Sequence, residues 1–97
     1  MDVQQQKAVL NLSEKEEQMP ETCVNWFRII ADIERAGKHK PRIAREIGVS
    51  RAAVGRFFRS EAMPRYDVGE RLIRMWMKST KQPIDQIPRI VYSEWAR

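Results

Sequence analysis

Apolar side chains recur at spacings of three and four residues in several stretches of the chain, the pattern of helices that bury one face. The first such stretch predicts a helix that begins near Pro20 to Thr22, where proline suits the first turn and threonine can cap, and that ends at Gly37. Its expected buried stripe consists of Cys23, Trp26, Phe27, Ile30, Ile33 and Ala36.

Two short helices joined by a tight turn are predicted in the stretch 40–59. The first runs from Pro41 to Ile47, and the second starts after Ser50, whose hydroxyl can cap it. Gly48 supplies the positive φ that the end of the first helix needs. The side chains expected in the core are Ile43, Ala44, Ile47, Val54 and Phe57, with Phe58 on an adjacent face.

A break is expected from Ser60 to Pro64, because the residue before a proline is pushed away from helical geometry. Asp67 is then predicted to cap a helix from Val68 to about Ser79. The apolar stripe of this helix consists of Val68, Leu72, Met75 and Trp76.

The segment after Pro83 is too apolar for a solvated tail in so small a protein. Either it folds back over the core or it meets a second copy of the chain. A short strand is allowed at Arg89 to Tyr92. The apolar residues of this segment are Ile84, Ile87, Ile90, Val91, Tyr92 and Trp95.

The expected fold class is therefore all-α, with about four or five short helices and one short strand allowed. Residues 1–19 are polar and are interpreted as an N-terminal arm, flexible or partly helical; alternatively, Ala8 to Leu12 form an edge strand or dock on a neighbouring subunit. Residues 20–79 form the helical domain, and residues 80–97 form a C-terminal tail that is a candidate dimerisation element.

Positive charge is concentrated in the middle of the chain. The net charge is +5 at pH 7, and the pI is about 9.8. Residues 1–34 carry 7 acidic and 3 basic side chains, whereas 35–65 carry 2 acidic and 9 basic ones, and 66–97 carry 4 and 6. This distribution favours a polyanionic partner for the two-helix stretch.

Several other classes of function are disfavoured by the composition. Cys23 is the single cysteine, so no internal disulfide forms, and with the single histidine, His39, it does not make a zinc site. No signal peptide, membrane span, catalytic arrangement or phosphate-binding glycine loop is found, so we expect a cytoplasmic protein without membrane contact, cofactor, metal or enzymatic activity.

Seven residues of the two-helix stretch resemble, in type and spacing, the helix-turn-helix signature of the lambda repressor and Cro family of phage and bacterial regulators. They are Ile43, Ala44, Ile47, Gly48, Val49, Val54 and Phe57. The five-helix domain of that family would cover Thr22 to Ser79. Met63 to Asp67 is similar to the loop after the recognition helix of such phage regulators. Lys40 departs from the glutamine of many members, so an amide contact is not expected there.

The resemblance implies that the second helix of the stretch enters the major groove of duplex DNA. Base reading is then assigned to the first residues of this helix and to two farther along: Arg51, Ala52, Gly55 and Arg56, the last to a base or a phosphate. Arginine donates two hydrogen bonds to guanine, and alanine contacts the thymine methyl group. Phosphate contacts are expected from Lys38, Lys40, Arg42, Ser50 and Arg59.

We therefore expect a sequence-specific transcriptional regulator, a repressor of phage or mobile-element type, that binds an inverted repeat as a homodimer. The expected dimer surface is the tail from Pro83 to Arg97 together with the helix that starts at Val68, and the N-terminal arm is the alternative. The expected contacts are Trp76, Ile87, Ile90, Tyr92 and Trp95. Two rival functions stay open. One is an antitoxin-type DNA-binding protein whose C-terminal tail binds a partner protein, and the other is an excisionase-like DNA-bending factor with weak sequence preference.

Overall fold

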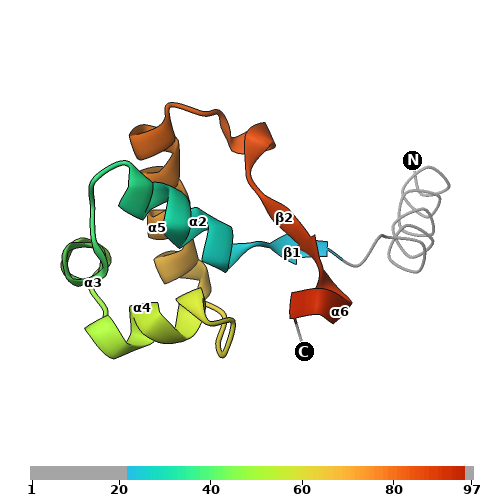
Figure 1. The fold of residues 1–97 in the computed structure, drawn as a ribbon, viewed down its shortest axis with the longest axis horizontal. Helices are drawn as coiled ribbons and strands as arrows, with labels where there is room; N and C mark the ends of the chain where they lie inside the picture. The colour runs from blue at the N-terminus through green and yellow to red at the C-terminus, as the bar shows by residue number, and fades with distance from the viewer. Residues whose placement is uncertain (1–21, 96–97) are drawn as a thin grey trace, which may run out of the picture.

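A computed structural model describes residues 22–95, which form a mostly helical domain with a small two-stranded sheet (Figure 1). The predicted N-terminal arm lies outside the described residues, as do the side chains of Tyr92 and Trp95. The elements follow in the order β1 (Thr22–Val24), α2 (Trp26–Arg35), α3 (Lys40–Ile47), α4 (Arg51–Phe58), α5 (Tyr66–Thr80), η1 (Ile84–Gln86), β2 (Arg89–Val91) and α6 (Tyr92–Trp95).

The sheet joins the two ends of the described chain. β1 pairs antiparallel with β2, and Cys23 lies opposite Ile90. Just before β2, Ile87 packs against the core, and the carbonyl of Pro88 accepts a hydrogen bond from the Asn25 amide at 2.9 Å. The C-terminal segment therefore folds back on its own protomer as far as β2. The mostly helical class and the allowed strand, which is β2, are confirmed, and the unpredicted strand β1 adds a two-stranded sheet.

Helix α2 begins later than the sequence pattern predicted. Asn25 is its N-cap, and the side-chain oxygen of Asn25 accepts a hydrogen bond from the Arg28 amide at 3.1 Å. The predicted start at Pro20 to Thr22 is wrong, because Thr22 belongs to β1. Cys23 accordingly lies half-buried on a strand and not on a helix.

Four helices bury one apolar core. Phe27 and Ala36 were predicted to be buried but are exposed, whereas Ile29 is fully buried. The buried face of α2 is the one that carries Trp26, Ile29, Ile30 and Ile33. The buried apolar residues are Trp26, Ile29, Ile30, Ile33, Ile43, Ala44, Ile47, Val54, Phe57, Val68, Leu72, Met75 and Trp76.

Helices α3 and α4 and the turn between them form as predicted. Gly48 closes α3 in the left-handed region, with φ of 79°, and its amide donates to the Ala44 carbonyl at 2.9 Å. Ser50 caps α4 by accepting a hydrogen bond from the Ala53 amide at 3.0 Å. In Figure 1, α3 is seen end-on while α4 runs across the view, so the two helices cross at a steep angle.

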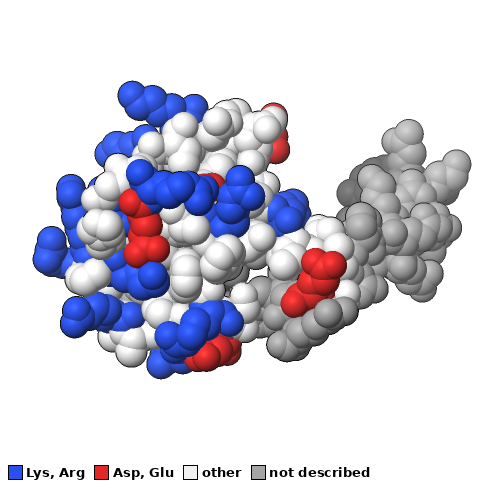
Figure 2. Space-filling view, viewed as in Figure 1, with Lys and Arg blue, Asp and Glu red and all other residues white. Residues whose placement is uncertain are grey.

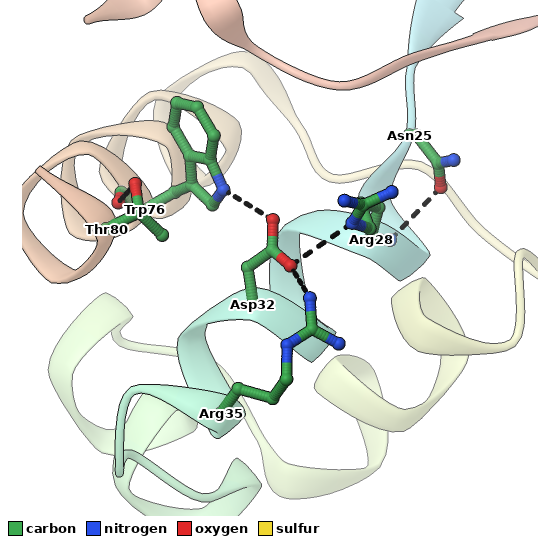
Figure 3. A network of polar contacts seen from close by, with 6 residues as sticks. All are labelled: Asn25, Arg28, Asp32, Arg35, Trp76 and Thr80. Atoms are coloured by element: carbon green, nitrogen blue, oxygen red, sulfur yellow. Dashed lines mark hydrogen bonds and ion pairs between the residues drawn. The ribbon is translucent and has the colours of Figure 1, made fainter. Parts of the chain in front are cut away.

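Helix α5 packs against α2 and α3. Its N-cap is Arg65 and not the predicted Asp67, which lies inside the first turn. Arg71 donates a hydrogen bond at 3.0 Å to the Ile47 carbonyl at the end of α3. The indole N–H of Trp76 donates to the Asp32 carboxylate of α2 at 2.9 Å (Figure 3).

Within residues 22–95, the helices are too short or too polar to cross a membrane.

Candidate nucleic-acid interface

The outer face of α4 presents most of the residues that were predicted to read bases. Arg51, Ala52 and Arg56 are exposed, and Gly55 is half-buried. Val54 and Phe57 anchor the opposite face of the helix in the core. The fold therefore leaves one side of α4 open to a ligand outside the protein.

Arg51 and Arg56 differ from most cations around them. Neither forms an ion pair with another residue in the range 22–95. Each guanidinium group therefore keeps its hydrogen-bond donors for solvent or for a partner molecule. Arg45, on the exposed side of α3, likewise pairs with no carboxylate of the described part.

Two cations predicted to contact phosphates share one carboxylate. Lys38 donates to Glu46 at 2.7 Å, and Arg42 donates to the other oxygen of Glu46 at 2.9 Å. These hydrogen bonds hold the pKa of the Glu46 carboxyl below its usual range. Glu46 is thus ionised at neutral pH and offsets part of the positive charge beside α3.

Lys40 is held inward by two contacts. Its ammonium group lies 3.1 Å from both carboxylate oxygens of Glu34 and 4.0 Å from the centre of the Phe58 ring. Phe58 in turn lies beside the exposed Phe27, with ring centroids 4.7 Å apart. Lys40 therefore fastens α3 to α2 and α4, a contact that the sequence did not predict.

Arg59 lies across the surface of α4. It donates two hydrogen bonds to Glu61, at 2.9 and 3.2 Å, which lower the pKa of the Glu61 carboxyl and raise that of the Arg59 guanidinium. A Cβ added at Gly55 would lie 3.2 Å from the end of the Arg59 side chain and near no backbone. Because that end is flexible, the fold itself does not require glycine at this position.

Ser50 caps α4 and is exposed to solvent. Its hydroxyl oxygen accepts the capping hydrogen bond from Ala53, and Ser50 is exposed. A hydroxyl has one donor as well as two acceptor positions, so its proton is still available to a phosphate oxygen.

The structure adds two arginines that the sequence analysis did not assign. Arg65 and Arg71 line, together with Arg56, a hollow of about 390 Å³ between α4 and the start of α5. Asp67 is the acidic residue in its lining. The sequence analysis identified the loop that contains Arg65 by its similarity to phage regulators. It did not identify Arg71, because the position of Arg71 in this hollow depends on how α5 packs on α3.

Figure 2 shows Lys and Arg side chains gathered over the end of the molecule that α3 and α4 form, away from the sheet. Acidic side chains lie among them, in agreement with the ion pairs of Glu34, Glu46 and Glu61. In residues 22–95, the groups that ligate metals do not gather in sets of three or more.

One of the expected dimer contacts is buried within the protomer. Trp76 is 3% exposed and is occupied within the protomer by the core and by Asp32, so its prediction as a contact with a second copy is wrong. Ile87 packs partly against the core, and Ile90 is half-buried in β2. The side chains of Tyr92 and Trp95 lie outside the described part.

Comparisons with protein-family models, with curated proteins and with solved structures found no match for this chain.

Proposed function

We propose that the chain is a sequence-specific, duplex-DNA-binding transcriptional regulator, a repressor that binds an inverted repeat as a homodimer. The observation that carries the proposal is the open face of α4. This face presents Arg51 and Arg56 without a carboxylate partner in the described range, next to a steep turn made by Gly48 and Ser50.

The dimensions and chemistry of α4 suit the major groove. An α-helix with its side chains is about 10–12 Å wide, and the major groove is about 12 Å wide. Arg51, at the N-terminus of α4, is assigned to guanine O6 and N7, while Ala52 is assigned to a thymine methyl group. Because Gly55 has no side chain, the backbone of α4 can approach the base edges at this position.

Phosphate contacts are assigned to four cations around α3 and α4 and to the hydroxyl of Ser50. The cations are Lys38, Lys40, Arg42 and Arg59. The ion pairs at Glu46 and Glu61 are exposed, so each contributes little to stability and can yield to a phosphate. Lys40 is held by both Glu34 and the Phe58 ring, so it is less free than the other cations to contact a phosphate.

The two rival functions have less support from the contacts. An excisionase-like factor with weak sequence preference depends on phosphate contacts, yet Arg51 and Arg56, on the outer face of α4, form no ion pair within residues 22–95 and are placed for base contacts. An antitoxin-type protein needs a tail that is free to bind another protein. The tail here packs on its own protomer through Ile87 and β2.

Selection of bound sites from random duplex DNA tests the proposal. We expect enrichment of an inverted repeat whose half-sites are centred about 10 base pairs, or a multiple of one helical turn, apart. Binding to DNA without enrichment of any sequence would instead favour the DNA-bending factor and would contradict the proposal.

A further inference from the structure

Helix α5 has a second apolar face that the core does not use. Tyr66, Ile73 and Met77 share one side of the helix, because side chains seven and four residues apart lie above one another. They line a groove of about 470 Å³ whose walls include Trp26 and Ile84. Tyr66 is 85% exposed and Ile84 is 56% exposed.

This groove contrasts with the core-facing side of the same helix. Val68, Leu72 and Met75 are buried among the other helices, whereas Ile73 and Met77 are only half-buried. A continuous apolar surface of this kind, bordered by charges, is typical of an interaction site.

The charges at the border of the groove indicate what covers it. Glu70 and Arg74 lie one turn apart and both line the groove. Within the protomer their closest approach is 3.6 Å, and their side chains are 48% and 76% exposed. Such a pair contributes little to the stability of one protomer, so both charges are available to a partner.

A second copy of α5 matches this arrangement. When two α5 helices pack antiparallel about a two-fold axis at position 72, Glu70 of each copy faces Arg74 of the other. The same axis brings the two Ile73 side chains close together, with the apolar stripes facing one another. The surface is therefore self-complementary in charge and in polarity, as a two-fold interface requires.

The groove also adjoins the candidate nucleic-acid interface. Arg65 lines both the groove and the hollow beside Arg56. A two-fold contact at the groove therefore lies next to the face of α4 that is proposed to read DNA, near the axis about which an inverted repeat is symmetric.

We propose that the outer face of α5, with Tyr66, Ile73 and Met77 at its centre and Glu70 and Arg74 at its border, is the contact between two copies of this chain. The inference rests on the proposed function, because the binding of an inverted repeat requires a two-fold dimer. It replaces the buried Trp76 and the C-terminal tail, as dimer contacts, with the exposed face of α5.

Sedimentation of the full chain without DNA tests this interface through charge exchange. Wild type is expected to dimerise as its concentration increases. Glu70→Arg and Arg74→Glu each replace two attractive contacts with two repulsive ones, so each should raise the dimer dissociation constant by at least about tenfold. A mixture of the two variants should form heterodimers, since both contacts are attractive again. Glu94→Arg on α6 is the control and should dimerise like wild type.

A wild-type chain that is monomeric at every concentration would overturn the inference and assign the groove to another occupant, such as residues 1–21. Single variants that dimerise like wild type, with unchanged melting, would also overturn it. The proposed function fails separately: a dimer of the expected kind that enriches no DNA sequence supports the interface and removes the function. A monomer that enriches one half-site removes the interface and the homodimer, while sequence-specific DNA binding stands.

Discussion

At the scale of single residues, the cations around α4 differ in the carboxylate that each one contacts. Lys38 and Arg42 share Glu46, and Arg59 contacts Glu61, whereas Arg51 contacts no carboxylate of the described range. Net charge alone did not distinguish these residues. The ion pairs separate side chains that are engaged within the protein from those that are ready for a partner.

Glu46→Gln should strengthen binding to every duplex sequence, because it removes a negative charge near the phosphates and releases Lys38 and Arg42. The salt dependence of binding should become steeper by about one unit of slope. Fluorescence anisotropy across a salt series measures both effects. Glu94→Gln on α6 makes the same charge change outside the candidate interface and should alter binding less. Equal effects of the two substitutions would contradict the role of Glu46.

Asp32→Ala should lower the free energy of unfolding by about 1–3 kcal/mol, because it leaves the buried Trp76 N–H without its acceptor. The same carboxylate also accepts from Arg28 and Arg35, as Figure 3 shows. Asp32→Asn retains an oxygen acceptor and should cost less than the alanine variant. Denaturant unfolding of both variants measures the difference, and identical stabilities would rule out the hydrogen bond as the cause.

At the scale of elements, local patterns were sufficient for α3, α4 and the turn between them. Gly48 and Ser50 act on residues within one helical turn, and Val54 and Phe57 are fixed by their helical spacing. β1 was missed because its partner, β2, lies far along the chain and leaves no local signal. That error moved the expected start of α2 and placed Cys23 on a helix, where the structure has it on β1.

The two glycines of the α3 and α4 region should respond to substitution in opposite directions. Gly48→Val should destabilise the domain strongly, since a β-branched residue resists the left-handed φ of 79°. Gly55→Ala should raise stability by about 0.5–1 kcal/mol, because Gly55 lies in a regular helix and an added Cβ meets only the flexible Arg59 side chain. Thermal melting compares the two, and an unchanged melting temperature for Gly48→Val would contradict the assigned turn.

At the scale of the whole molecule, the α3 and α4 end carries the charges and the far end carries the sheet (Figures 1 and 2). The sequence predicted the charged end, since the basic residues cluster in one stretch. It did not predict the hollow beside Arg56 or the outer face of α5. Both depend on how α5 packs against α2 and α3, which is a tertiary contact.

The most direct test of sequence-specific reading by α4 is site selection from random duplex DNA with wild type and Arg51→Ala in parallel. Wild type should enrich an inverted repeat. Arg51→Ala should lose preference at one position of each half-site and bind the wild-type site more weakly by about 1–3 kcal/mol. An unchanged preference at every position, or no enrichment by wild type, would contradict the assignment of α4 as the recognition helix.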